Sequence, residues 1–409
     1  MLYDIVIVGA GASGLMCSAY LSANNINKKV LIIDKNEKPG KKIIATGNGK
    51  CNLSNTLITS NDYISNNQDF IEYFPKLKEN KEIIEFFNEI GVLTKNINNG
   101  IYPLTEQSFI VRDLLTYKIK ENKNIDFLLS CTVNKIIKDD KYILETSKGI
   151  IKTNILIMAT GGKSYPKFGS DGSGHTLITN LGLKSTKTYP ALTALITKEN
   201  LKDIKGVRAK TKVTLLINNK EISNEVGEVQ FTEYGLSGIC IFNLSNYITS
   251  NLKEKIIINL DLLPELSEND LLKELTKRKN RLSNKPIYYL LKGILNDKII
   301  DYLESYLFLN NKLINELREN DFLSIIKSIK NLSFNIKDVK GYDFAQVTMG
   351  GISIKEINYD NFSSKKDNNL YILGELLDVT GKCGGFNLHF AFLSGYLAAK
   401  HIGENYDKN

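Results

Sequence analysis

A glycine-rich turn near the start of the chain has the residue types and spacing of a site for nucleotide phosphates. Gly9, Gly11 and Gly14 form the pattern G-x-G-x-x-G between an apolar run at residues 3–8 and a helical stretch at residues 14–24. Gly9 permits a tight turn, Gly11 lets a pyrophosphate approach the backbone, and Gly14 lets the helix pack closely on the strand. The N–H groups that begin the helix would then face the phosphates.

An acidic residue stands where the second strand of such a unit should end. Asp34 follows the apolar run 30–33 and lies twenty residues after Gly14. A carboxylate at this point accepts hydrogen bonds from a ribose. The strand, turn, helix and acid together predict a nucleotide-binding unit rather than a chance glycine turn.

Later segments favour FAD over NAD as the bound nucleotide. Residues 159–162, Ala-Thr-Gly-Gly, follow another buried apolar run, and Gly374-Glu375 follows a third, with Asp378 nearby. In flavoproteins with two-dinucleotide folds, the chain returns to the cofactor at such points. There is no second G-x-G-x-x-G of the same quality, so we expect no separate NAD(P)H domain. NAD(P)H is then expected only as a transient reductant.

The elements that must position these segments predict a discontinuous α/β protein with one long insertion. Short β-rich runs begin near residue 187, helical segments follow, and glycine-rich motifs return near residue 342. Residues 126–146 are expected to form a small antiparallel element. The expected domains are an FAD-binding domain, an inserted β domain and a helical cap, at residues 1–186 plus 342–409, 187–265 plus 332–341, and 266–331.

Composition sets further bounds on function. The chain has 409 residues, of which 42% are hydrophobic and 24% charged, with a formal net charge of +8. It has no apolar run of membrane-span length and no basic region of the kind that begins a signal peptide. The five cysteines are scattered and the three histidines lack metal-ligand spacing, so we expect reduced thiols, a cytoplasmic protein, no membrane partner and no metal.

Six motifs, in order along essentially the whole chain, resemble those of the BaiN/RdsA-like FAD-dependent oxidoreductases. The motifs lie at residues 9–14, 46–52 (Thr-Gly-Asn-Gly-Lys-Cys-Asn), 159–166, 231–238, 347–351, and 374–378 through 384–387. The resemblance implies a Rossmann-like FAD domain, an inserted β-barrel and a helical subdomain. It also implies reduction of conjugated C=C bonds, because the family has been linked to a uridine of large-subunit ribosomal RNA and to bile-acid enones. Some members are labelled aminoacetone oxidases.

The resemblance also implies a set of cofactor-binding residues. They are Gly9, Gly11, Ala12, Ser13, Gly14, Asp34, Lys35, Lys42, Gly47, Gly49, Cys51, Asn52, Val133, Ala159, Thr160, Gly161, Gly374, Glu375, Asp378, Gly385, Phe386 and Asn387. The chain departs from the family at three positions: Lys50 stands where Arg is frequent, Phe386 where Tyr is common, and His389 where aromatic or Gln variants occur. None of these departures touches the glycines expected to bind FAD.

Three residues in these motifs are candidate proton donors. Reduction of an enone-like C=C bond needs a hydride on one carbon and a proton on the other, and a thiol of Cys51 or Cys383 could supply the proton. Alternatively, each cysteine is a small packing residue in a glycine loop. His389 is a rival donor. By resemblance, Asn387 starts a helix aimed at the flavin pyrimidine edge; it could equally be an N-cap.

The predicted helical segment carries a concentration of positive charge. Lys273, Lys277 and Arg281 recur at i, i+4 and i+8, and Arg278 and Lys279 lie among them. Such a stripe can bind the phosphates of RNA, although a lysine-rich solvated helix face would have the same pattern.

Four functions are consistent with these residues. The leading hypothesis is NAD(P)H-dependent reduction of uridine to dihydrouridine in 23S ribosomal RNA, with RNA bound through the five basic residues. The alternatives are a reductase of small steroid-like or bile-acid-like enones, an amine oxidase, and a non-catalytic flavoprotein that assists ribosome assembly.

Overall fold

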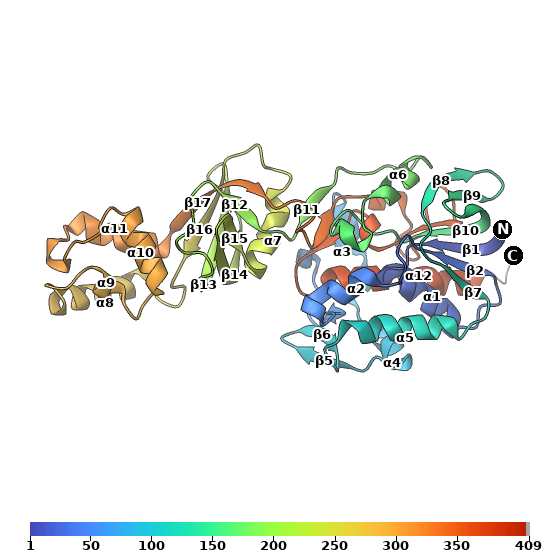
Figure 1. Ribbon diagram of the computed structural model, residues 1–409, viewed down its shortest axis with the longest axis horizontal. Helices are drawn as coiled ribbons and strands as arrows, with labels where there is room; N and C mark the ends of the chain where they lie inside the picture. Colours follow the sequence, from blue (N-terminus) through green and yellow to red (C-terminus); the bar gives the residue numbers. More distant parts are fainter. Residues whose placement is uncertain (406–409) are drawn as a thin grey trace. The chain divides into compact units, whose positions relative to one another are not determined.

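The chain folds into two compact units, each with its own hydrophobic core (Figure 1). The computed structural model describes residues 1–405, apart from the side chains at positions 68, 73 and 75. Residues 1–190 and the chain from residue 346 onward form the first unit, and residues 191–345 form the second. The second unit is therefore an insertion into the first.

The first unit is built on a seven-stranded sheet of Rossmann type. Four strand pairs are parallel (β7–β2, β2–β1, β1–β10 and β10–β19), while β9 and β8 continue the sheet antiparallel. The strands are β1 (Leu2–Val8), β2 (Val30–Ile33), β7 (Ile125–Leu128), β8 (Val133–Lys138), β9 (Tyr142–Thr146), β10 (Gly149–Met158) and β19 (Leu370–Ile372). The residues of β2 and the last four of β1 are all buried, as expected for parallel strands covered on both faces.

Helices cover this sheet and position its glycine turns. They are α1 (Ala12–Ala23), α2 (Lys41–Ala45), α3 (Gln68–Tyr73), α4 (Lys81–Glu89), α5 (Ser108–Lys120), α6 (Ser173–Thr179) and α12 (Phe386–Asn405). Helix α12 lies directly on α1, because a Cβ atom at Gly395 would be only 2.3 Å from the carbonyl oxygen of Ser13. The last helix of the chain is thereby held against the first glycine turn.

Short strands complete the first unit. They are β3 (Ser54–Asn55), β4 (Tyr63–Ile64), β5 (Thr94–Ile97), β6 (Gly100–Pro103), β18 (Val347–Met349) and β20 (Thr380–Gly381), with β11 (Tyr189–Ala191) at the boundary. The prediction of one antiparallel element over residues 126–146 is wrong for its first strand. β7 follows helix α5 and pairs parallel with β2, because a helical crossover returns the chain in the same direction.

The second unit contains a closed barrel of six antiparallel strands. In barrel order they are β12 (Leu195–Thr197), β15 (Gly235–Ser237), β14 (Lys220–Thr232), β13 (Arg208–Ile217), β16 (Ile256–Asp261) and β17 (Leu332–Val339), and helix α7 (Ile239–Ile248) packs on them. Alternate residues such as Val213, Leu215 and Phe334 are fully buried and fill the interior.

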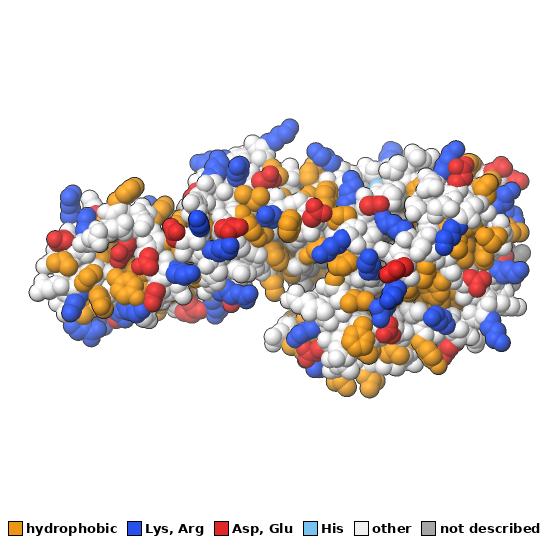
Figure 2. All heavy atoms as spheres, viewed as in Figure 1, with side chains coloured by type: hydrophobic (Ala, Val, Ile, Leu, Met, Phe, Trp, Pro, Cys, Tyr) orange, Lys and Arg blue, Asp and Glu red, His pale blue; other side chains and the backbone are white. Residues whose placement is uncertain are grey.

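Four helices lie between the barrel strands β16 and β17. They are α8 (Glu268–Arg281), α9 (Tyr288–Leu291), α10 (Asp297–Tyr306) and α11 (Glu319–Lys330). Lys330 ties the return to the barrel to the exit from it: its Nζ lies 2.6 Å from Asp261 Oδ2 and donates to the carbonyls of Leu263 and Leu266. Figure 2 shows Lys and Arg side chains gathered over α8. None of the helices in the described chain has the length and apolar character needed to cross a membrane.

The structure confirms the predicted fold class. The discontinuous Rossmann-type unit, the inserted barrel and the helices beyond it are all present.

Candidate active site

The turn between β1 and α1 is shaped by its glycines, but for two different reasons. A Cβ atom at Gly9 would lie 2.3 Å from the Ala159 carbonyl oxygen, and one at Gly14 would lie 2.0 Å from that of Gly9. These two glycines are therefore required by the protein's own packing. A Cβ atom at Gly11 would meet no protein atom within 4 Å. The chain thus leaves open space at the first turn of α1, where N–H groups can bind an anion.

Asp34 fastens this turn to the end of β2. Its Oδ2 accepts a hydrogen bond from the Ala10 N–H at 2.7 Å, and its Oδ1 accepts one from the Asn36 N–H at 2.7 Å. An ionised carboxylate has about four acceptor positions, so Asp34 can still accept bonds from ribose hydroxyls. The neighbouring Lys35 is engaged by Asp171, with Nζ and Oδ2 2.7 Å apart.

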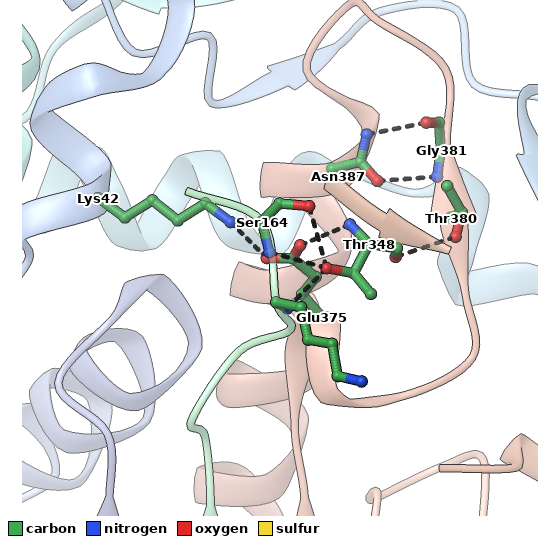
Figure 3. A network of polar contacts seen from close by, with 8 residues as sticks. Lys42, Ser164, Thr348, Glu375, Thr380, Gly381 and Asn387 are labelled. Carbon is green, nitrogen blue, oxygen red and sulfur yellow. Dashed lines mark hydrogen bonds and ion pairs between the residues drawn. The ribbon is translucent and has the colours of Figure 1, made fainter. Parts of the chain in front are cut away.

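Glu375 joins cofactor motifs that are far apart in the sequence (Figure 3). Its Oε2 lies 2.8 Å from Lys42 Nζ, and its Oε1 accepts the Thr348 N–H at 2.8 Å. The hydroxyl oxygen of Thr348 in turn accepts the N–H groups of Lys163 and Ser164 at 2.7 and 3.1 Å. One carboxylate therefore connects the 159–166, 347–351 and 374–378 motifs with α2.

Two buried polar atoms in the predicted cofactor set have no partner among the described residues. They are the side-chain oxygens Asn52 Oδ1 and Thr160 Oγ1. Buried polar atoms in folded proteins almost always have a hydrogen-bond partner, so an orphaned acceptor or hydroxyl indicates a missing ligand or water. Together with the open space at Gly11, these atoms fit a bound dinucleotide such as FAD.

Other members of the predicted cofactor set lie around the same turns. Ser13 contacts Gly374, where an added Cβ atom would be 2.9 Å from the serine hydroxyl. Gly47 and Gly49 adopt positive φ angles of 56° and 85° before Cys51. Val133 begins β8, two residues after Cys131, whose N–H donates to the Asp34 carbonyl. Asp378 is 2% exposed, and this burial raises the pKa of its carboxyl group.

Asn387 holds a loop rather than capping a helix. It lies in the first turn of α12, where its Oδ1 accepts the Gly381 N–H at 2.8 Å and its Nδ2 donates to the Gly381 carbonyl at 2.9 Å (Figure 3). The N-cap alternative is therefore wrong, because the side chain is used by the 381–382 segment. This double bond fixes the segment that carries Cys383.

His389 is enclosed within the first unit. Its side chain is fully buried, with Nε2 3.1 Å from the Leu77 carbonyl oxygen and Nδ1 3.0 Å from Ser54 Oγ. Because a carbonyl only accepts, the proton is on Nε2 and the Ser54 hydroxyl donates to Nδ1. Burial lowers the pKa of His389 to about 4. A neutral ring with both nitrogens engaged is a structural residue, which argues against His389 as the proton donor.

We expect this buried imidazole to make the protein less stable in mild acid. The folded pKa of His389 is about 4, below the usual 6.5, so the unfolded state binds the extra proton between these values. Stability is therefore complete above pH 6.5 and falls as the pH drops toward 4, by about 3 kcal/mol from this group. Urea unfolding at several pH values, compared with His389→Gln, measures the difference. His175, whose pKa burial also lowers, is present in both proteins. Parallel curves for the two proteins would contradict the assignment.

The two candidate cysteines have opposite environments. Cys51 is fully buried at a positive φ of 58°, and burial raises the pKa of its thiol to about 12. Cys383 is partly exposed, with its sulfur 3.8 Å from Gln346 Oε1, in the loop that precedes Gly384 and Gly385. Cys383 is thus the one of the two that a substrate can reach.

The predicted RNA-binding residues divide into two groups. Arg278 donates from Nε to Glu274 Oε1 and from its guanidinium to the Lys292 carbonyl, and Lys279 reaches the Leu317 carbonyl. These two cations therefore stabilise the helical part of the second unit itself. Lys273, Lys277 and Arg281 are exposed and have no side-chain partner among the described residues. We call these three residues the basic stripe.

Sequence reasoning missed Thr348 and Ser54 as contributors to the site. Thr348 stands in the recognised 347–351 motif, but its role depends on the Glu375 contact, which only the fold creates. Ser54 lies two residues beyond the 46–52 motif and fixes the tautomer of His389.

Comparisons with known proteins decide the family. The model of the HI0933-like protein Rossmann domain matches residues 3–401. The chain belongs to this family. It is similar to the 3-dehydro-bile acid delta(4,6)-reductase of Clostridium scindens, with 32% identity over 98% of this chain and 99% of that protein. It is also similar to the ribosomal RNA dihydrouridine synthase of Escherichia coli, with 27% identity over 98% of each.

The fold is shared with flavoenzymes of known structure. The E. coli quinol fumarate reductase FrdA aligns over all of this chain and 71% of its own, with 14% identity and a TM-score of 0.50. A flavocytochrome c3 fumarate reductase aligns over 78% of its own chain with the same identity and score. Family membership and the reductase relatives identify this chain as an oxidoreductase of the flavoprotein type.

Proposed function

We propose that this protein is an FAD-dependent reductase that uses NAD(P)H to convert a uridine of large-subunit ribosomal RNA to dihydrouridine. The observation that carries the RNA substrate is the basic stripe, because Lys273, Lys277 and Arg281 point into solvent with no internal partner. Three cations at successive helical turns match the spacing that phosphate binding needs. The dihydrouridine synthases among the relatives support the same substrate.

The residues of the first unit have separable tasks in this reaction. The open turn at Gly11 and the start of α1 would hold the FAD pyrophosphate, and Asp34 would hold a ribose. Bound FAD supplies hydride chemistry. The Asn387 bonds to Gly381 fix the loop that places Cys383, which holds the proton at Sγ. Uracil is an α,β-unsaturated carbonyl, so saturation of C5=C6 needs hydride at C6 and this proton at C5. We place this chemistry in the cytoplasm, where ribosomal RNA is found.

A second candidate substrate is a small enone of the bile-acid type. The 32% identity to the bile-acid reductase, over nearly the whole of both chains, favours it. The same hydride and proton chemistry applies, because an enone is also an α,β-unsaturated carbonyl. A small enone has no phosphates, so the basic stripe would be irrelevant to its turnover.

Replacing the basic stripe distinguishes the two substrates. The triple variant Lys273→Ser, Lys277→Ser, Arg281→Ser should bind single-stranded RNA more weakly and flatten its log–log salt dependence by about 0.7 per lost contact. A matched control replaces three other exposed lysines of the same unit, Lys253, Lys298 and Lys327, and loses the same charge. Dihydrouridine in an rRNA fragment and reduction of a steroid enone are measured for all three proteins.

Only RNA reduction should fall, and only in the stripe variant. Equal loss in the control variant would show that net charge alone matters. Nucleoside mass spectrometry of ribosomal RNA from cells with and without the gene tests the substrate directly. Unchanged dihydrouridine content, together with rapid steroid-enone turnover, would replace the first candidate by the second.

A further inference from the structure

The basic stripe lies on the side of α8 that faces α9. Arg278, one helical turn from Arg281, sends its guanidinium to the carbonyls of Leu290 and Lys292 at the end of α9. Lys279 lies on the opposite flank of the helix, where its Nζ is 5.2 Å from the ring centre of Phe322 in α11. The stripe therefore borders the surface of α9, with Arg278 between them.

An exposed aromatic ring stands on that border. Tyr289 in α9 is 49% exposed and lies one residue before Leu290, whose carbonyl Arg278 approaches. Its neighbours Leu290 and Leu291 are buried, and Tyr288 is held by a hydrogen bond from Lys292 Nζ to its hydroxyl at 2.6 Å. The Tyr289 and Tyr288 rings meet edge to face at 5.6 Å, which leaves a face of Tyr289 toward solvent. In Figure 2 hydrophobic and basic side chains lie beside one another over α8 and α9.

We infer that Tyr289 is a stacking platform for an unpaired nucleotide base, and that α8 and α9 together form a surface for single-stranded RNA. This inference rests on the proposed function, whose RNA substrate it makes more specific. A row of cations follows a phosphate backbone, and an aromatic ring beside the row receives a base turned out of its stack. A duplex would bind the cations alone, because its bases are already stacked. A uridine that is reduced on a flavin must itself leave its stack, so an unpaired stretch of RNA is the form that the enzyme meets.

Binding of labelled RNA to the FAD-loaded full-length protein tests this surface. Fluorescence polarisation is measured with a single-stranded uridine-rich dodecamer and with the same strand in a duplex. The variants are Tyr289→Ala, Tyr289→Leu and Tyr289→Phe, and the control is Tyr117→Ala, which removes a 65% exposed ring from α5 in the other unit. Flavin absorbance and thermal unfolding show that each variant is folded.

Loss of the ring should weaken single-strand binding by about 5- to 100-fold without changing its salt dependence. Tyr289→Leu should behave as Tyr289→Ala does, since it retains apolar area but no ring, and Tyr289→Phe should bind as the parent protein does. Duplex binding and the Tyr117→Ala protein should be unaffected.

Three results would overturn the inference. They are unchanged single-strand binding in Tyr289→Ala, an equal loss on the duplex, or competition by polyglutamate that shows the same dependence on Tyr289. The last result would indicate an acidic protein as the partner. The dihydrouridine assay separates this failure from that of the proposed function. Product formed equally by Tyr289→Ala and the parent protein would contradict only the platform. RNA binding with no dihydrouridine would contradict only the reaction.

Discussion

Gly11→Val should yield a folded protein that is purified without flavin. Gly11 has φ −83° and ψ −162°, an extended conformation open to any residue, and a Cβ atom there meets no protein atom within 4 Å. The valine side chain would occupy only the space that the FAD pyrophosphate needs. We expect flavin affinity to fall by more than about 100-fold while the unfolding free energy of the apoprotein changes by less than about 1 kcal/mol. Absorbance near 450 nm and urea unfolding measure the two effects.

Two further glycines make this result specific. Gly341→Val is the matched control, because Gly341 also has open space around its Cβ position but lies outside the cofactor motifs. That variant should retain flavin. Gly14→Ala should fail differently, by losing the fold, since its Cβ atom would collide with the Gly9 carbonyl. Full flavin content in purified Gly11→Val would show that the pyrophosphate lies elsewhere.

Cys383→Ala should reduce substrate turnover by about 100-fold or more while leaving flavin reduction by NAD(P)H intact. The partly exposed thiol of Cys383 is the proposed source of the proton, and loss of a positioned general acid costs about 10²- to 10⁴-fold. Stopped-flow bleaching of the flavin measures the first half-reaction, and product formation measures the second. Only the second should change.

Cys51→Ala is the matched comparison for this prediction. Cys51 is fully buried, and its thiol pKa of about 12 keeps it protonated at neutral pH. Its removal should lower stability by about 1 kcal/mol through the small cavity, with turnover within about twofold of the parent protein. The opposite pattern, with slow turnover in Cys51→Ala and normal turnover in Cys383→Ala, would exchange the two roles.

Local motifs predicted well those features that depend on neighbours in the sequence. The turn at Gly9 to Gly14 and the position of Asp34 are each set by a few consecutive residues and their strand–helix context. By contrast, Cys51 and Cys383 stand in equally convincing motifs, and only the packing of α12 and its neighbours makes one buried and the other accessible. The local sequence contains no such information, because burial depends on segments more than 300 residues apart, such as Ser54 and His389.

The same limit applies to the charged helix. The spacing of Lys273, Lys277 and Arg281 predicted a common face, and these three residues are exposed. Arg278 and Lys279 have the same charge and stand beside them in the sequence. They turn inward because the carbonyls of Leu290, Lys292 and Leu317 are within their reach. A count of charges could not separate the two groups; only the arrangement of α9 and α11 does so.

The pairing of β10 with both β1 and β19 has a consequence for the order in which the chain folds during synthesis. Met158 pairs with Ile372, so the strand that completes this side of the sheet leaves the ribosome only after the whole of residues 191–345. At about 5–20 residues per second, the delay between the two strands is about 10–40 s. The contiguous insertion has a hydrophobic core of its own and can fold within that interval. The nascent first unit meanwhile presents an unpaired strand edge of apolar residues, which is a site where a chaperone would bind.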